Sequence, residues 1–229
     1  MRSVLFIAGL CAVMASRTWA ATLSGTVRDT TGHQIQNALV IVRSAHSGNE
    51  VARSRTDASG AYAFSSLPTG DFSIAISAPG FMTTTVRDIR LNEQEKSMRP
   101  VMLNLGNGCG SIPVPEYLRP LEGADDTGRI SGTVADHATN RPIANASIEL
   151  ICESSRSCAE TTSDAAGHYT FFRDAGAYSL RIRRSGYFED EYRTYHVEAG
   201  FETVYYPIFL DRCQKGKCQP ARKPFPRCE

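Results

Sequence analysis

The residues of this chain that could carry chemistry are its serines, its adjacent carboxylates and its cysteines. No serine lies in a Gly-x-Ser-x-Gly turn, the arrangement that exposes a nucleophilic serine in many hydrolases. Acidic residues are adjacent at Asp125-Asp126 and at Glu189-Asp190-Glu191. Because consecutive strand residues point to opposite faces, these carboxylates favour a solvated edge over an acid–base pair or a calcium site. We therefore expect a protein that is not an enzyme and that needs no cofactor and no metal.

The cysteines predict disulfides. Six of them follow the N-terminal leader: Cys109, Cys152, Cys158, Cys213, Cys218 and Cys228. An even number is typical of disulfides in exported proteins, and a zinc site is disfavoured because no Cys-x2-Cys pair occurs. Cys152 and Cys158 flank a short turn between two expected strands, whose ends lie within the roughly 4–7 Å between Cα atoms that a disulfide needs.

The other four cysteines leave several pairings open. If every thiol is paired, the three tail cysteines cannot pair only among themselves, so one of them must bond Cys109. We favour Cys109–Cys213 together with Cys218–Cys228. This pairing would fasten the linker to the tail and restrict the motion of the two modules.

An aromatic cluster is the one candidate binding feature. Tyrosines gather near the end of the chain's second half, and four of them are candidates for stacking on a ligand: Tyr192, Tyr195, Tyr205 and Tyr206. Exposed rings of this kind bind sugars or anchor protein partners. The alternative is cross-strand packing that only stabilises a hairpin.

The charge distribution excludes one class of partner and suggests another. The whole chain has 25 basic and 24 acidic residues, so nothing in its net charge predicts nucleic-acid binding. The tail over residues 212–229 is basic, with one acidic residue, Glu229. We expect it to be a solvated extension or to make weak contact with anionic surfaces.

The first 20 residues have the pattern of a secretory signal peptide. Arg2 precedes an apolar run from Val4 to Ala15, and Ala20 offers a cleavage site. The run is too short to cross a bilayer as a helix, and no later segment approaches that length. Cys11 raises a lipid anchor as an alternative, which Leu10 disfavours. We expect a secreted or periplasmic protein without a transmembrane segment.

The chain contains a long internal repeat. Ser24-Gly25-Thr26-Val27 recurs 107 positions later as Ser131-Gly132-Thr133-Val134, and Thr56 to Tyr62 recurs at the same offset as Ser163 to Tyr169. Matches that stay in register indicate a duplicated domain. We expect modules at 22–105 and 129–211, joined by a Gly/Pro-rich linker over 106–128 and followed by the basic tail.

Each repeat has the periodicity of β-strands. Apolar residues alternate with small or charged ones, as at Ile74 and Ile76 and again at Leu180 and Ile182. Turn residues separate these runs every 8 to 12 positions. The pattern predicts an all-β chain of two tandem seven-stranded antiparallel β-sandwiches, with no sheet running across both.

Several motifs together resemble a known family. They are a Gly-x-Val first strand, an Ala-x-Val or Ala-x-Ile second strand, a Thr/Ser-Asp-x-x-Gly-x-Tyr hairpin and a Gly-Phe or Gly-Tyr turn. Both repeats resemble the carboxypeptidase regulatory-like domain, a transthyretin-like sandwich related to collagen-adhesin repeats. The resemblance implies structural turns at Asp57, Gly60, Asp164 and Gly167, where Asp accepts backbone hydrogen bonds and Gly adopts a conformation costly for other residues.

The chemistry of related proteins is not implied by these residues. None of the five histidines is followed three positions later by Glu, as in zinc carboxypeptidases. The first strands contain no lysine for an isopeptide bond, and no Tyr-Arg-Gly-Ser motif of hydroxyisourate hydrolases occurs. We expect a non-catalytic protein that acts in binding or as a structural spacer, with an unknown protein or polysaccharide partner. The alternative is a carbohydrate-binding module that uses the tyrosines of the second repeat.

Overall fold

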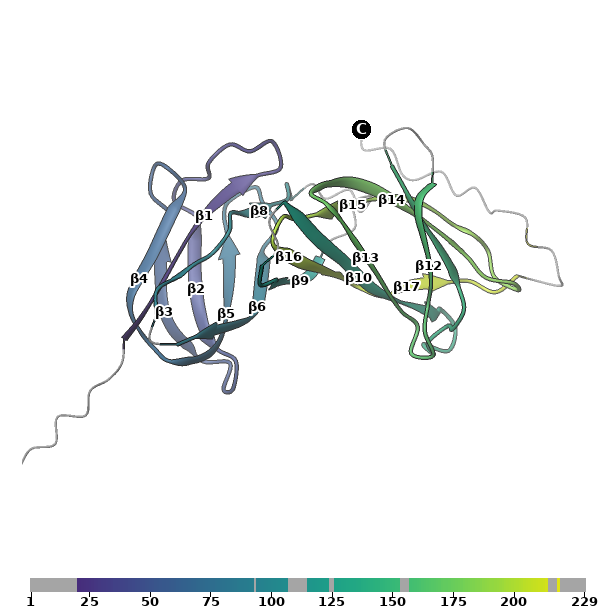
Figure 1. Cartoon of the computed structure of the whole chain (residues 1–229), viewed down its shortest axis with the longest axis horizontal. Coiled ribbons are helices and arrows are strands. Elements are labelled where there is room, and N and C mark those ends of the chain that lie inside the picture. The colour runs from purple at the N-terminus through teal and green to yellow at the C-terminus, as the bar shows by residue number, and fades with distance from the viewer. Residues whose placement is uncertain are drawn as a thin grey trace, which may run out of the picture.

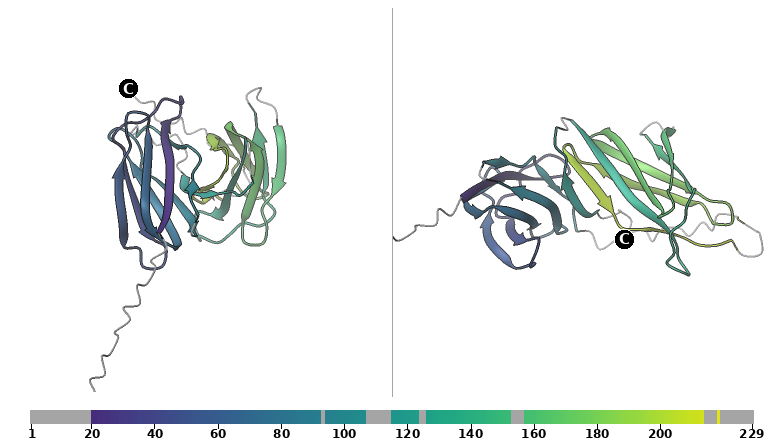
Figure 2. Two further views of the ribbon diagram at one scale, coloured as in Figure 1. Left: turned by 60° about the vertical axis from the view of Figure 1, so that its left-hand side comes forward. Right: turned by 60° about the horizontal axis from the view of Figure 1, so that its bottom comes forward.

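In the computed structural model, two β-sandwich modules lie side by side along the longest axis of the molecule (Figures 1 and 2). The structure describes residues 20–92, 94–106, 115–123, 126–152, 157–213 and 218. All of its regular elements are strands, and the described part of the chain has no helix that could cross a membrane.

Eight strands belong to each repeat, and one lies between the repeats. Module 1 contains β1 (Ala20–Asp29), β2 (Leu39–Ser44), β3 (Glu50–Arg55), β4 (Ala61–Pro68), β5 (Gly70–Ser77), β6 (Thr84–Leu91), β7 (Lys96–Ser97) and β8 (Val101–Leu103). The connecting segment contains β9 (Pro115–Pro120). Module 2 contains β10 (Thr127–Asp136), β11 (Ser147–Ile151), β12 (Ser157–Thr162), β13 (His168–Asp174), β14 (Gly176–Arg183), β15 (Asp190–Val197), β16 (Phe201–Tyr205) and β17 (Ile208–Leu210).

The two modules pair their strands in the same way. In module 1, β4-β1-β7 faces β6-β5-β2-β3, and in module 2, β13-β10-β16 faces β12-β11-β14-β15. Alternation along each strand supplies the core: Ile74 and Ile76 are fully buried on β5, while Ala75 between them is partly exposed. Leu180 and Ile182 repeat this arrangement on β14.

A glycine in the first strand of each module makes room for a tyrosine. Gly25 lies opposite Tyr62, and Gly132 lies opposite Tyr169. A Cβ atom on Gly25 would come within 2.5 Å of the Tyr62 hydroxyl, and one on Gly132 within 2.6 Å of the Tyr169 hydroxyl. The motifs Ser-Gly-Thr-Val and Gly-x-Tyr therefore recur because each module needs the same contact between a glycine and a tyrosine.

The hairpin turns use the residues that the sequence implied. Asp57 Oδ1 accepts hydrogen bonds from the backbone N–H groups of Ser59 and Ala61, and Asp164 Oδ1 accepts the equivalent pair from Ala166 and His168. Gly60 and Gly167 have φ values of 74° and 77°. This left-handed conformation favours glycine.

The sheets are mixed, so the expectation of purely antiparallel sandwiches was wrong. The last two strands of each module run parallel to its first strand: β7 and β8 beside β1, and β16 and β17 beside β10. The chain crosses from one sheet to the other after β6 and after β15. After this crossing, the chain runs along the free edge of the first strand in the direction of that strand. Each module thus has eight strands where seven were expected.

The connecting segment joins the modules into one sheet, so the expectation that no sheet runs across both modules was wrong. A nine-stranded sheet runs β13-β10-β16-β9-β6-β5-β2-β3, with β17 also paired to β10. Glycines and prolines suggested only a linker, but Pro115 and Pro120 lie at the two ends of β9. Proline is tolerated at strand ends because few ladder hydrogen bonds are lost there.

The disulfides are formed in part as expected. Cys152 and Cys158 are bonded, with Cα atoms 5.9 Å apart. Cys213 bonds Cys218, with Cα atoms 5.0 Å apart, so the favoured pairs Cys109–Cys213 and Cys218–Cys228 were wrong. Closing a loop with a separation of 5 costs less entropy than joining distant segments. Cys109 and Cys228 lie outside the described residues.

Candidate binding groove at the module joint

The joint between the modules is built around β9. This strand pairs antiparallel with β16 of module 2 and meets β6 of module 1 in parallel at Val86↔Leu118. Leu118 is fully buried and belongs to the hydrophobic core of module 1. Phe201 of β16, 1% exposed, joins the same core. One residue of β9 and one of module 2 thus complete the interior of module 1.

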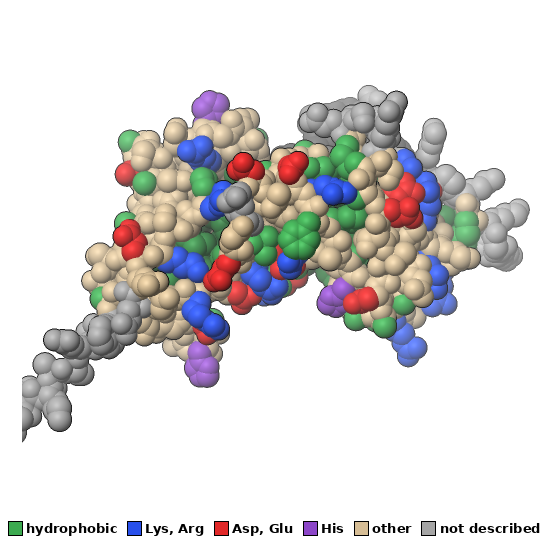
Figure 3. Space-filling model, viewed as in Figure 1, with side chains coloured by type: hydrophobic (Ala, Val, Ile, Leu, Met, Phe, Trp, Pro, Cys, Tyr) green, Lys and Arg blue, Asp and Glu red, His purple; other side chains and the backbone are tan. Residues whose placement is uncertain are grey.

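Ion pairs cross the joint on the outer face of the sheet. Arg119 on β9 donates to Asp88 of module 1 at 2.5 Å and to Glu202 of module 2 at 2.9 Å. The Asp88 hydrogen bond, with help from Glu202, raises the pKa of the Arg119 guanidinium. Figure 3 shows basic and acidic side chains intermingled over the middle of the molecule, where Figure 1 places β9.

A second carboxyl group is buried at the joint. Glu198, 3% exposed, lies in the turn between β15 and β16 and accepts a hydrogen bond of 3.5 Å from the backbone N–H of Met102 on β8. Burial raises the pKa of Glu198 to about 8. This contact crosses from module 2 to module 1, so its strength depends on the charge of the carboxyl group.

The outer face beside the joint is hollowed into a groove of about 470 Å³. Its lining comes from four neighbouring strands. They contribute Tyr117 and Arg119 from β9, Ser131 and Thr133 from β10, His168 and Thr170 from β13, and Glu202 and Val204 from β16. The outward positions of a strand alternate with core positions, so the lining residues recur at every second position. The groove therefore presents hydroxyl, imidazole, phenol and guanidinium groups on a rigid surface.

Aromatic rings border the groove. Phe172 is 54% exposed, and the Arg129 guanidinium carbon lies 4.2 Å from its ring centre. Tyr117 is paired in the same way with Arg87, at 4.4 Å. A guanidinium held over one ring face fixes the orientation of the ring.

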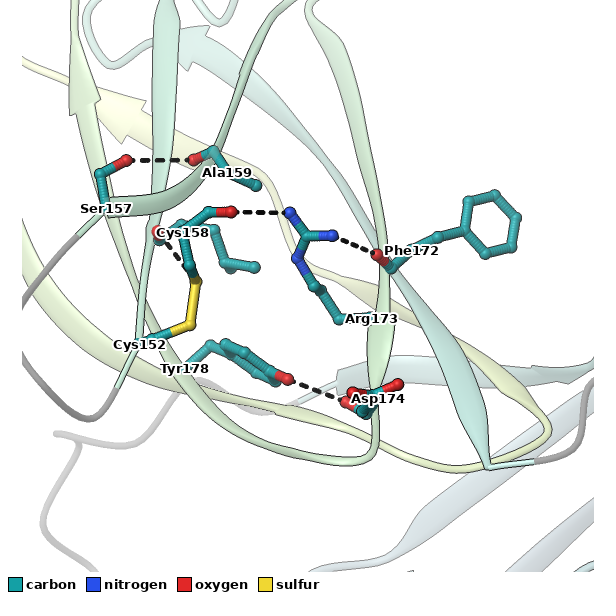
Figure 4. The surroundings of a disulfide bond; sticks show 9 residues. Cys152, Ser157, Cys158, Ala159, Phe172, Arg173, Asp174 and Tyr178 are labelled. Atoms are coloured by element: carbon teal, nitrogen blue, oxygen red, sulfur yellow. Dashed lines mark hydrogen bonds between the residues drawn. A yellow bond between two sulfur atoms is a disulfide. The ribbon is translucent and has the colours of Figure 1, made fainter.

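The Cys152–Cys158 disulfide supports the backbone beneath Phe172. Arg173 donates from its two terminal nitrogens to the carbonyl oxygens of Phe172 and Cys158, at 3.2 and 2.9 Å. Figure 4 shows the Phe172 ring directed away from the disulfide and from Arg173. The crosslinked hairpin thus holds β13 from one side while the ring projects from the other.

Comparison with known proteins identifies the family. A family profile described as carboxypeptidase regulatory-like domain matches residues 22–104 and 129–206, more than half of the chain. The chain belongs to the carboxypeptidase regulatory-like domain family. No curated protein matches the chain.

The chain also has low similarity to solved structures. The Bacillus anthracis TIE protein is 17% identical, with a TM-score of 0.34, over 84% of this chain and 34% of its own. A streptococcal ancillary pilin is 13% identical, with a TM-score of 0.33, over 87% and 64%. The minor pilin of Streptococcus agalactiae is 14% identical, with a TM-score of 0.34, over 89% and 100%. This chain thus spans less than two thirds of the first two.

Two of the four tyrosines expected to bind ligand are core residues of the second regulatory-like module. Tyr195 and Tyr205 are 2% and 3% exposed, and their ring centres lie 4.6 Å apart. The Tyr205 hydroxyl bonds the backbone of His196. Tyr206 is 58% exposed, and the side chain of Tyr192 lies outside the described part of the structure. Ligand stacking by Tyr195 and Tyr205 was therefore a wrong expectation, because both face the sandwich interior.

Sequence reasoning missed the residues of the groove. The signal was present as an alternation on β13, where His168, Thr170 and Phe172 occupy outward positions between buried Tyr169 and Phe171. Without the position of β9, nothing in the sequence linked this alternation to Tyr117. Among the described residues, no group of three or more His, Cys, Asp or Glu is arranged to hold a metal ion.

Arg212 belongs to the second regulatory-like module rather than to a solvated tail. It donates to Asp136 at 2.6 Å, and Asp136 also accepts a hydrogen bond from the Tyr187 hydroxyl at 2.8 Å. Asp136 is 2% exposed, and the hydrogen bond from Arg212, followed by those from Tyr187 and Thr139, keeps the pKa of its carboxyl group well below the usual range. The first basic residue of the expected tail therefore closes the end of the module.

Proposed function

We propose that this protein is an exported, non-catalytic unit in which two regulatory-like modules act as one rigid body, for binding or as a structural spacer. The observation that carries this proposal is the sheet that continues across the joint through β9. Flexible tandem domains bury little surface between them and move independently by default. Here a strand and two core residues are shared instead.

Bending at the joint would disrupt two kinds of interaction at once. Leu118 and Phe201 would leave the core of module 1, and Arg119 would lose a carboxylate on one side. Fully burying a Leu or Phe side chain is worth about 1.5–3 kcal/mol each. The joint therefore resists bending far more than a Gly/Pro linker would.

The proposal of export is supported by the N-terminal sequence and the disulfides, and the proposal of a non-catalytic role is supported by the structural hydrogen bonds of the polar residues. The first 20 residues have the pattern of a signal peptide, and two disulfides among the described residues support an oxidising compartment. The polar side chains that recur in both repeats, Thr56 and Asp57 with Ser163 and Asp164, hold turns and strand ends. Their recurrence supports a structural use.

Nuclear magnetic relaxation of the backbone amides tests the rigid unit. We expect the amides of both modules to report one rotational correlation time in the mature protein. Leu118→Asp should place a charge in the core of module 1, release β9 and give two shorter correlation times. Tyr206→Ser, at an exposed position, is the matched control and should behave like the wild type. Independent tumbling of the modules in the wild-type protein would contradict the proposal.

A further inference from the structure

The two modules share their interior but differ on one outer face. The paired positions Ser24↔Ala63 and Thr26↔Ala61 of module 1 correspond to Ser131↔Thr170 and Thr133↔His168 of module 2. The serine and threonine of the first strand are the same in both. The facing strand carries Ala61, Ala63 and Ser65 in module 1, and His168, Thr170 and Phe172 in module 2.

Other differences between the modules lie on both sides of β13. Arg129, which lies over Phe172, has Thr22 as its counterpart at the offset of 107 that relates β10 to β1. The disulfide between Cys152 and Cys158 corresponds to Ser44 and Val51, and Arg173 corresponds to Ser66. Module 1 therefore has neither the ring nor the groups that orient it.

An exposed aromatic ring lies at each end of this face. Along β10, the outward residues from Arg129 to Ala135 span about 20 Å at roughly 3.3 Å per residue. Phe172 lies at one end, and Phe209 of β17, paired with Ala135 and 44% exposed, lies at the other. Hydroxyl groups and the His168 imidazole lie between the two rings. The strip thus has the length of several sugar residues.

We propose that the outer face of the module 2 sheet binds a neutral polysaccharide, with Phe172 as the stacking ring and Ser131, Thr170 and His168 as hydrogen-bonding groups. Aromatic rings bind the apolar faces of sugars, and hydroxyl and imidazole groups bind sugar hydroxyls in either direction. This site goes beyond the rigid-unit proposal and does not depend on it.

Charge balance favours a neutral ligand. Arg119 pairs with Asp88 and Glu202, and Arg129 lies 3.7 Å from Glu202. The guanidinium groups of the groove are thus already opposed by carboxylates. A polyanion would have to displace these partners, whereas a neutral chain meets no net charge.

Affinity electrophoresis of the mature protein tests the site. The gels would contain one of four neutral polymers: a β-1,3-glucan, a β-1,4-glucan, an α-1,4-glucan or a β-1,4-mannan. We expect at least one of them to retard the wild-type protein. The variant H168A/T170A/F172S replaces the three residues with those of module 1 at equivalent positions, so the fold should tolerate it. Its affinity should fall by about tenfold or more, as for the loss of a central anchor.

Two controls make the result decisive. Val51→Ala removes an exposed apolar side chain of module 1, 40% exposed, and should leave retardation unchanged. Thermal unfolding of the triple variant must match that of the wild type for the loss to count. Absence of retardation by all four polymers would overturn the proposal, as would equal retardation of the wild type and the triple variant. Retardation by heparin alone would overturn it in favour of a polyanion ligand.

Discussion

The glycines of the Asp-x-x-Gly turns show how single residues set the fold. A Cβ atom on Gly167 would come within 2.5 Å of the Val134 carbonyl oxygen, and one on Gly60 within 2.6 Å of the Val27 oxygen. The hydrogen bonds of these glycines use only backbone N–H and C=O groups, which other residues also have. Their role is therefore a conformational and steric one.

Gly167→Ala should destabilise the protein by about 2–4 kcal/mol in chemical denaturation, because strain and a backbone clash add together. Gly186→Ala is the matched control, since its φ of 86° is similar but nothing lies within 4 Å of the added carbon. That variant should lose only about 1 kcal/mol, the cost of the left-handed conformation. Equal losses in the two variants would show that the clash is relieved at no cost.

A buried hydroxyl group fastens the start of each Asp-x-x-Gly turn to the segment just before the second strand of its module. Ser163 Oγ accepts from the Ala146 N–H at 2.9 Å and donates to the Ile143 oxygen at 2.7 Å. Ser163→Ala should cost about 1–3 kcal/mol, because both backbone groups lose a buried partner. Ser163→Thr should be close to neutral, since Thr56 makes the same two bonds in module 1. Chemical denaturation of the two variants measures the difference.

Among the strands, the two modules share the same pairing but differ in a local crosslink. The β11–β12 hairpin carries a disulfide, whereas the equivalent β2–β3 hairpin of module 1 does not. The crosslink closes a short loop at the edge of the second sheet. Through Arg173 it also contacts the backbone of β13.

Replacing Cys152 and Cys158 together by Ala should lower the free energy of unfolding by about 2 kcal/mol, the value that chain entropy gives for so short a loop. Module 2 should lose protection in hydrogen exchange more than module 1. The reduced wild-type protein, which also loses the Cys213–Cys218 disulfide, should lose at least as much protection in module 2 as the variant. Unchanged protection of β13 amides in both would show that Arg173 alone holds this strand.

For the whole molecule, the buried Glu198 makes the joint sensitive to pH. Its pKa is raised to about 8 in the folded protein by burial, from an ordinary value of 4.5. The folded state therefore favours the protonated carboxyl group. The stability it contributes is present in full below about pH 4.5, and is lost as the pH rises through 8.

Glu198→Gln should remove this loss, because the amide stays neutral and its oxygen can still accept from Met102. The difference in unfolding free energy between variant and wild type should grow from pH 5 to pH 9. Burial lowers the pKa of His196, so this residue reduces the stability of the fold as the pH falls. Both proteins contain His196, and its effect therefore cancels in the difference between their unfolding free energies. Glu122→Gln, at an exposed residue, is the control. A difference that does not vary with pH would contradict the role of Glu198.

Local patterns in the amino-acid sequence were enough to predict the modules, their turns and much of their core. Alternation at Ile74 and Ile76, the turn residues Asp57 and Gly60, and the spacing of Cys152 and Cys158 all depend on chain neighbours. Such features follow from backbone geometry and hydrogen bonds over a few residues, and so they can be deduced from local patterns. The repeat strengthened each inference by showing it twice.

The tertiary structure alone decided which segments meet. The parallel return of β16, the insertion of Leu118 into the core of module 1 and the burial of Tyr195 and Tyr205 all join residues far apart in the chain. A strand pattern fixes that side chains alternate, but not which face is covered by another sheet. That choice depends on the packing of whole elements, and it placed the candidate groove on β13 rather than on the tyrosines.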